Sequence, residues 1–413
     1  MKKLVYLIIF LLYSAGMNAQ LKDLVQYVNT LQGTDSNFGL SYGNTYPTTG
    51  MPYGMHMWSA QTGKNGNGFK YLYASDKIRA FSQSHQCSPW VSDYAVYSFM
   101  PMVGELVVNQ DARATKFSHA NEIAKPHYYK VTFDNGITTE MAPTTRGVHL
   151  RFSYPVTGDA YLVLDGYTAM SEINIDPEKR QISGWVNNQR FVNDSKSFRN
   201  YFVVQFDKPF EDYGTWENQK DEVFPKKVDG AGKGYGAFIK FKKGSKVQAK
   251  AASSYISAEQ ALVTLNKELG KDKKLEATKI RGQKTWNEVL NRIVVEGCTD
   301  EQMKTFYSCL FRANLFSRKF YERKDNGDPY YYSPYNGKIY DGYMYTDNGF
   351  WDTFRSQFPL TNILHPTLQG RYMNALLAAQ EQCGWLPSWS SPGETGGMLG
   401  NHSISLLADA WAK

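Results

Sequence analysis

The sequence predicts an antiparallel β-sandwich followed by a helical region, and two observations carry this prediction. Between residues 94 and 250, apolar residues alternate with polar ones or form short runs bounded by Gly, Asp, Asn or Pro. Such runs are typical of short strands joined by turns. Near Ser257 the apolar positions take up helical spacing instead. Strands without interleaved helices favour a sandwich over a parallel α/β sheet.

Residues 1–19 have the pattern of a secretory signal peptide. Lys2 and Lys3 precede an apolar run over residues 4–13, and small or polar residues follow up to Ala19. The run is shorter than the roughly 20 residues that span a bilayer, so a retained anchor is the less favoured alternative. We expect export to the periplasm or the extracellular space, with no membrane span after cleavage.

Composition and charge exclude several classes of protein. With 413 residues, 42% of them hydrophobic, the chain can bury a large core and form more than one domain. The net charge of +7 comes from scattered lysines without a basic stripe, so we expect no nucleic-acid partner. The four cysteines lie far apart and form no CxxC pair, which argues against structural zinc but leaves disulfides open. No residue is assigned as a metal ligand.

We expect the sandwich to occupy residues 20–256, a helical linker residues 257–298 and a further helical domain residues 299–413. Clear strand signals lie at residues 128–133, 148–152, 160–164, 201–206 and 237–241.

The expected helices have identifiable ends. Residues 257–269 and 274–293 have helical spacing, and Thr299 and Gln302 match a capping box before another amphipathic helix. A helix over residues 367–383 ends before Gly384, which suits the left-handed residue after a helix.

A last apolar helix begins near His402, and the sequence stops at Lys413 within that pattern. A helix that stops without a cap leaves carbonyl groups and an apolar face without partners. We therefore expect the sequence to be a fragment. The alternative is a small helical domain whose last helix faces solvent.

The segment YTDNGFWDTFRSQFPL, residues 345–360, has the composition of a sugar-binding site. Trp351, Asp352 and Arg355 fall within about one turn, directly after turn-forming residues. An indole face can stack on a pyranose, and a carboxylate and a guanidinium supply forked hydrogen bonds to vicinal hydroxyls. The alternative is a helix start with a core tryptophan and a surface ion pair.

Four segments together resemble glycoside hydrolase family 92, which comprises exported bacterial α-mannosidases. They are GNTYPTTGMPYGM (43–55), FSQSHQCSPWVSDYAVYSFMP (81–101), YTDNGFWDTFRSQFPL (345–360) and GWLPSWSSPGETGGMLGNHSISLLADAW (384–411). The resemblance implies a sandwich packed on an (α/α)6 barrel, with the pocket at their interface and only the first part of the barrel within residues 299–413. It also implies exo-acting, inverting hydrolysis of α-mannosides in glycans, mostly α-1,2-linked, with a bound calcium ion whose ligands lie mainly outside this chain.

The resemblance assigns several substrate-binding residues on the helical side. Trp351 and Asp352 match the pair that holds the terminal mannose, and Arg355 would orient Asp352 or reach a hydroxyl. Trp389 is expected to line the pocket. His402 is expected at the pocket rim, with capping of its own helix as the alternative.

From the sandwich, His85 and Trp90 are expected on a loop that reaches over the pocket, where His85 would donate to a sugar hydroxyl. The alternative is a loop histidine that is solvated or bonded to backbone. Residues 87–90 depart from the family pattern, which is more glycine-rich there, so the resemblance does not define the side of the pocket that faces the leaving group.

Inverting hydrolysis needs a carboxylic acid and a carboxylate about 6.5–9.5 Å apart. In family 92 both lie in later barrel segments, so we assign no catalytic residue here and expect this chain to be inactive by itself. Two other classes stay open: a non-catalytic carbohydrate-binding protein, and a disaccharide phosphorylase with the same two-part architecture.

Overall fold

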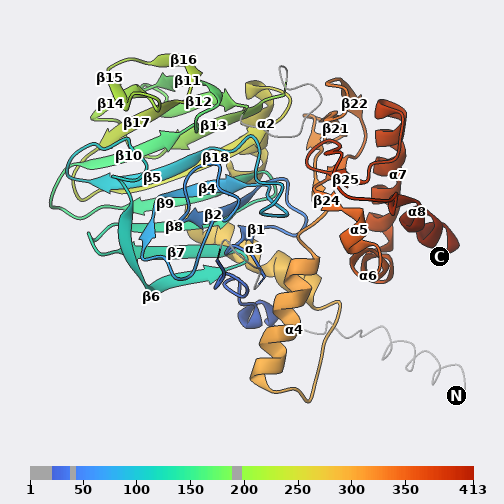
Figure 1. Ribbon diagram of the computed structural model, residues 1–413. Coiled ribbons are helices and arrows are strands. Elements are labelled where there is room, and N and C mark those ends of the chain that lie inside the picture. The colour runs from blue at the N-terminus through green and yellow to red at the C-terminus, as the bar shows by residue number, and fades with distance from the viewer. Residues whose placement is uncertain (1–20, 38–42, 188–197) are drawn as a thin grey trace, which may run out of the picture.

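The computed structural model describes residues 21–37, 43–187 and 198–413. The predicted signal peptide at residues 1–19 lies outside this part of the chain. The remainder forms a large β region followed by a smaller helical region (Figure 1). No helix among the described residues combines the length and apolarity needed to cross a membrane.

Two antiparallel sheets form the β region, and they pack face to face around a shared core (Figure 1). The predicted sandwich is thereby confirmed. The eight-stranded sheet has the order β1 (Thr49–Gly50), β2 (Met57–Gln61), β4 (Ala80–Ser84), β5 (Ser98–Val103), β10 (Ala160–Asp165), β17 (Tyr235–Phe241), β14 (Asp212–Glu217), β15 (Glu222–Pro225). The ten-stranded sheet has the order β16 (Asp229–Lys233), β11 (Met170–Asp176), β12 (Gln181–Val186), β13 (Asn200–Phe206), β18 (Lys246–Ser254), β9 (Gly147–Ser153), β8 (Thr138–Pro143), β7 (Tyr128–Phe133), β6 (Thr115–Lys125), β3 (Lys77–Ile78).

Strand alternation directs side chains to the core between the sheets. Along β7, Tyr129, Val131 and Phe133 are buried there. Burying one such apolar side chain contributes about 1.5–3 kcal/mol. Tyr128, on the opposite face of β7, packs instead against Leu275 of a helix. The ten-stranded sheet is therefore also covered on its outer face at β7.

Helices α2 (Ala258–Leu269) and α3 (Leu275–Leu290) provide this second cover. Ser257 caps α2, because its side chain accepts a hydrogen bond from the Gln260 N–H at 3.1 Å. Leu265 of α2 packs on Val203 of β13. The segment predicted as a linker thus lies on the sandwich.

Helix α4 (Asp300–Ala313) begins with the predicted capping box, since Thr299 and Gln302 exchange both bonds. It packs with α3 and the short 3-10 helix η1 (Leu24–Tyr27). After it come three small sheets, formed by β19 (Arg318–Lys319) with β23 (Tyr345–Thr346), by β20 (Glu322–Arg323), β21 (Pro329–Tyr332) and β22 (Ile339–Asp341), and by β24 (Asn348–Gly349) with β25 (Trp389–Ser390).

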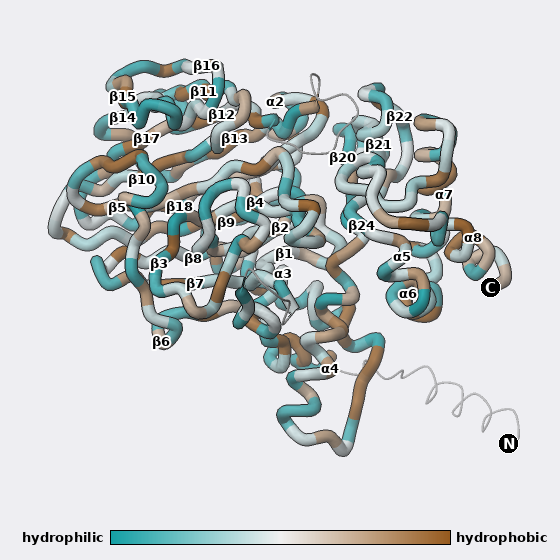
Figure 2. The backbone as a smooth tube through the Cα atoms, viewed as in Figure 1, coloured by the Kyte–Doolittle hydropathy of each residue, from teal (hydrophilic) through white to brown (hydrophobic). Residues whose placement is uncertain are grey.

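The C-terminal helices are α5 (Phe350–Thr353), α6 (Gln357–Leu364), α7 (Pro366–Cys383) and α8 (Ser403–Ala412). Gly384 ends α7 with φ of 92°, as its position predicts. Apolar stretches run along α7 and α8, whereas the β14, β15 and β16 edge of the sandwich is more hydrophilic (Figure 2). These helices and the small sheets share a second core rich in tyrosine.

Candidate functional site

A cavity of about 890 Å³ lies between the sandwich loops and the helical region. Residues from segments 43–48 and 86–91 line it on one side, and residues from segments 312–316, 347–360 and 389–398 on the other. Ligand pockets in proteins commonly have about this volume and occur at such junctions.

The pairing of β24 with β25 brings two predicted site residues to one wall of this cavity. Gly349 lies opposite Trp389 in the ladder and three residues before Asp352. A Cβ atom on Gly349 would lie 2.1 Å from Nε1 of Trp389 and 2.4 Å from Oδ2 of Asp352. Only glycine at position 349 therefore leaves room for both the indole and the carboxylate against the backbone.

The loop after β25 is fixed by Glu394. Its carboxylate accepts hydrogen bonds from the Ser388 N–H at 2.8 Å and from the Ser388 hydroxyl at 3.0 Å. The Gly396 N–H donates to the same side chain at 2.9 Å. This ring of bonds holds the backbone on both sides of Trp389, whose side chain is mostly buried.

Three other predicted residues on the helical side do not line the cavity. Trp351 is exposed and lies 6.3 Å from the His402 ring. The His402 ring stacks on Phe354 at 4.4 Å and makes no capping bond to α8. Arg355 also lies over the Phe354 ring, with its guanidinium 5.0 Å from the ring centroid. In the part of the chain that the structure describes, Arg355 forms no ion pair with Asp352, so the expected orienting contact is not seen.

On the sandwich side, Trp90 lines the cavity and is 64% exposed. Its ring meets Phe69 edge-on at 6.0 Å. This arrangement leaves a large apolar surface at the cavity wall.

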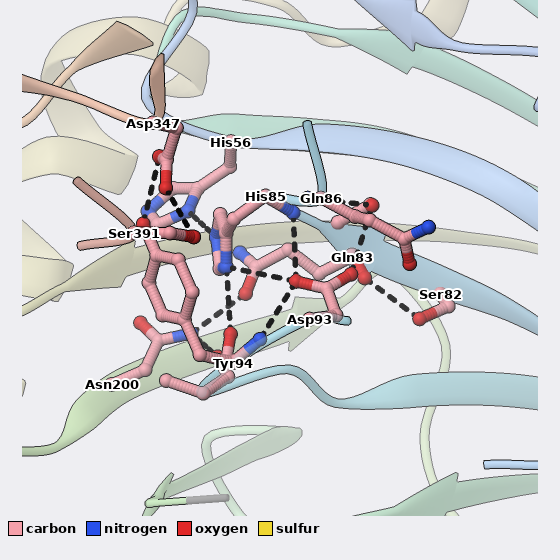
Figure 3. Close-up of polar contacts among 12 residues, drawn as sticks. His56, Ser82, Gln83, His85, Gln86, Asp93, Tyr94, Asn200, Asp347 and Ser391 are labelled. Carbon is pink, nitrogen blue, oxygen red and sulfur yellow. Dashed lines mark hydrogen bonds and ion pairs between the residues drawn. The ribbon is translucent and has the colours of Figure 1, made fainter. Parts of the chain in front are cut away.

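The structure departs from the expectation for His85, which directly follows β4 and is completely buried (Figure 3). Its backbone N–H donates to Asp93 at 3.0 Å. Its Nδ1 lies 2.8 Å from the Tyr94 carbonyl, which can only accept, so Nδ1 carries the proton. Nε2 then accepts from Nδ1 of His56 at 2.7 Å. His85 is thus engaged inside the protein and has no donor for a sugar, because Asp93, Tyr94 and His56 occupy its polar groups.

Burial lowers the pKa of both His56 and His85 well below the usual value, so both rings are neutral. They lie between Tyr94 and Tyr255, beside the ion pair of Arg318 and Asp347.

Asp347 lines the cavity but its carboxylate is fully used. Oδ2 accepts from the Tyr94 hydroxyl at 2.9 Å and pairs with Arg318, and Oδ1 accepts from the Ser391 hydroxyl at 3.0 Å. Burial raises the pKa of Asp347, and the Arg318 guanidinium acts in the opposite direction. The backbone has φ of 64°, a left-handed turn that Asp tolerates better than most residues. The sequence indicated only this turn.

Sequence reasoning missed further cavity residues, namely Arg312, Gln86 and Cys87. Tyr46 also lines the cavity and donates its hydroxyl to the Gln86 carbonyl at 2.6 Å. Burial raises the pKa of the Cys87 thiol well above its usual range. All four cysteines are free. Arg312 lies on α4 among the apolar residues of its helical stripe, so the sequence pattern gave no sign that it lines a cavity.

Sequence profiles of two domains match this chain. The glycosyl hydrolase family 92 N-terminal domain matches residues 27–254, and the glycosyl hydrolase family 92 catalytic domain matches residues 260–413. The chain belongs to glycosyl hydrolase family 92. The resemblance of the four sequence segments is thereby confirmed.

Solved structures agree with this assignment. The inverting family GH92 mannosidase BT2199 from Bacteroides thetaiotaomicron VPI-5482 is 44% identical with a TM-score of 0.92, over 96% of this chain and 53% of that one. The family GH92 α-mannosidase BT3965 from Bacteroides thetaiotaomicron, also solved with mannoimidazole, is 23% identical with a TM-score of 0.81, over 94% of this chain and 53–54% of that one, and shows the fold.

A curated relative, an uncharacterized secreted glycosidase of Arthroderma benhamiae, is 22% identical over 334 residues, which are 71% of this chain and 41% of that protein. The chain therefore spans about half the length of the structures it matches, and less of this relative.

The family 92 resemblance implies a bound calcium ion. Among the described residues, no group of three or more His, Cys, Asp or Glu side chains is placed to hold a metal ion. Calcium binds several oxygen ligands, mostly carboxylates and carbonyls. The expectation that the calcium ligands lie mainly outside this chain stays a prediction.

Proposed function

We propose that this family 92 protein is part of an exo-acting, inverting α-mannosidase. The enzyme removes terminal mannose from glycans, mainly from α-1,2 linkages. The observation that carries the proposal is the convergence of Asp352 and Trp389 across Gly349 on one cavity wall. The 44% identity to an inverting mannosidase supports the same reaction.

In this proposal Asp352 accepts hydrogen bonds from mannose hydroxyls, and the Trp389 indole presents an apolar face to the ring. Trp90, on the sandwich side of the cavity, contacts the sugar that leaves. Because Gly349 has no side chain, both polar and apolar contacts reach the same monosaccharide.

We propose that the 413-residue chain binds mannosides without hydrolysing them. Inversion needs two available carboxyl groups about 6.5–9.5 Å apart. Asp347 and Asp352 are the described carboxylates that line the cavity, and Asp347 is held by Arg318, Tyr94 and Ser391. The acid, the base and most calcium ligands are expected from segments of the whole enzyme outside this sequence.

The proposed organisation is a sandwich over residues 20–256, a linker over 257–298 and the first part of an (α/α)6 barrel over 299–413. The last sandwich strand ends at Ser254 and α4 begins at Asp300, which supports these boundaries. Export by the predicted signal peptide accords with a relative described as secreted.

The test compares the 413-residue protein with the product of the whole reading frame. We expect the chain to bind mannose in calorimetry and to release no aryl alcohol from an aryl α-mannoside, whereas the whole product hydrolyses it. Turnover by the verified chain would refute the proposed inactivity. A stop codon directly after Lys413 would favour a binding protein, and phosphate-dependent cleavage of an α-glucoside would favour a phosphorylase.

A further inference from the structure

Arg312 lies on α4 and lines the cavity without a carboxylate partner. It is partly buried, and none of the ion pairs among the described residues includes it. Three more deeply buried guanidinium groups in the described part have such partners. They are Arg113 with Asp165, Arg146 with Glu268 and Arg318 with Asp347.

The hydrogen bonds of Arg312 use one nitrogen of the guanidinium. Nη2 donates to the Thr30 carbonyl at 3.0 Å, to the Gln32 carbonyl at 2.9 Å and to the Thr45 hydroxyl at 3.1 Å. All three acceptors are neutral. Among the described residues, Nε and Nη1 have no hydrogen-bond acceptor, so this edge of the planar fork stays available.

The charge of Arg312 is also left uncompensated. Burial lowers the pKa of Arg312 to about 10, and the groups that oppose this effect are the Tyr46 phenol and the Cys309 thiol. Neither is a carboxylate. At pH 7 the guanidinium remains protonated, and a cation removed from water without an anion is costly.

We propose that Arg312 forms an oxyanion site in the cavity wall, where Nε and Nη1 bind two oxygens of a phosphate or sulfate group. The group is either a substituent of the glycan or a free inorganic anion. The two sources share the chemistry of paired N–H donors and positive charge. The inference rests on the proposed function only in placing the sugar and the anion in the same cavity.

A purely structural role would tie α4 to residues 30–45 through Nη2. That role accounts for the three observed hydrogen bonds. It does not explain the buried charge or the free Nε and Nη1 edge of the guanidinium. The two roles predict different ligand behaviour, because a structural tie leaves anion affinity absent or unchanged by substitution.

The experiment titrates the 413-residue protein with inorganic phosphate, mannose and mannose 6-phosphate by calorimetry at pH 7. We expect phosphate and mannose 6-phosphate to bind, and Arg312→Met to weaken both by about tenfold or more. Mannose affinity should stay unchanged in this variant. Lys304→Met removes an exposed charge from the same helix and should change none of the three.

Equal affinity of the wild-type protein for mannose and mannose 6-phosphate, with no phosphate binding, would overturn the site. So would phosphate binding that Arg312→Met leaves intact. If Arg312→Met does not fold, Arg312→Lys keeps the charge without the fork and should still lose affinity for both anions. If mannose 6-phosphate binds about tenfold tighter than phosphate, the anion is a substituent of the glycan. If the two bind equally, it is a free inorganic anion. If mannose fails to bind while phosphate does, the oxyanion site stands and the proposed function fails.

Discussion

The Arg318 guanidinium and the Asp347 carboxylate form an ion pair in which neither side chain is exposed to solvent. Arg318 also donates to the Met55 carbonyl and the Tyr94 hydroxyl, both of which belong to the N-terminal half of the chain. The pair therefore joins the sandwich to the segment that carries the cavity wall. Its energetic role is testable.

Replacing Arg318 by Met should leave Asp347 as an unpaired buried charge and cost about 3–5 kcal/mol of unfolding free energy. Urea denaturation followed by fluorescence measures this loss. As a control, Lys179→Met removes the exposed pair with Asp176 and should leave the midpoint unchanged. A midpoint for Arg318→Met equal to that of the wild type would show that the buried pair contributes nothing.

Gly349→Ala should abolish mannose binding, because the new methyl group would displace both Trp389 and Asp352. Gly370 provides a matched control in α7, where an added Cβ meets no atom within 4 Å. Gly370→Ala should keep affinity and stabilise the helix by about 0.5–1 kcal/mol. Calorimetry and thermal unfolding of both variants measure these effects. Retained affinity in Gly349→Ala would contradict the proposed mannose site.

Asp352→Ala should weaken mannose binding by about 1.5–3 kcal/mol, the usual contribution of a charged hydrogen-bond acceptor. The fold should persist, because Asp352 is exposed and has no ion pair among the described residues. Circular dichroism checks the fold, and calorimetry the affinity. Unchanged affinity would remove Asp352 from the site.

Trp90→Ala should weaken binding of an α-linked mannobiose by about tenfold while leaving mannose affinity nearly unchanged, since the indole faces the leaving sugar in our proposal. Trp385 is similarly exposed but does not line the cavity. Trp385→Ala should bind both ligands as the wild type does. Equal losses for both ligands in Trp90→Ala would place the indole beside the terminal sugar instead.

Glu322 should make stability depend on pH. Burial raises its pKa to about 7, and its Oε1 accepts from the Tyr255 N–H at 2.8 Å. Because the folded state holds the proton more tightly, this contribution is full below about pH 4.5 and is lost as pH rises through 7. The full contribution of Glu322 to the free energy of unfolding is about 3 kcal/mol.

Glu322→Gln should remove that contribution, so its stability relative to the wild type rises between pH 5 and 8. Urea unfolding across this range measures the difference. Glu381→Gln, an exposed change on α7, serves as the control and should follow the wild-type curve. Parallel curves for Glu322→Gln and the wild type would contradict the buried titration.

Local sequence signals predicted the elements well, because alternation, capping and turn preferences act over a few residues. The strand at residues 128–133, the capping box at Thr299 and the helix end at Gly384 all agree with the structure. Side-chain environment depends instead on distant partners. His85 looked like a loop donor because nothing near it in sequence reveals that Tyr94 and His56 enclose it.

The same reasoning explains the unpredicted parts of the site. Arg318 and Asp347 are 29 residues apart, and each appears in the sequence as an ordinary charged residue. The strands β24 and β25 have two residues each, too short for any periodic pattern. Asp352 and Trp389 were recognisable because their motifs resemble those of family 92. Their meeting across Gly349 required the tertiary structure.

The cavity walls come from residues near 43–91 and from residues beyond 312, so more than two hundred intervening residues must be in place before the walls meet. Contacts of such long sequence separation form late in folding, after local structure has already appeared. A ligand that occupies the cavity thus binds the finished arrangement alone and opposes its separation by mass action. Mannose affinity would then serve as a readout of completed assembly, more selective than helix or strand content, which reports local structure.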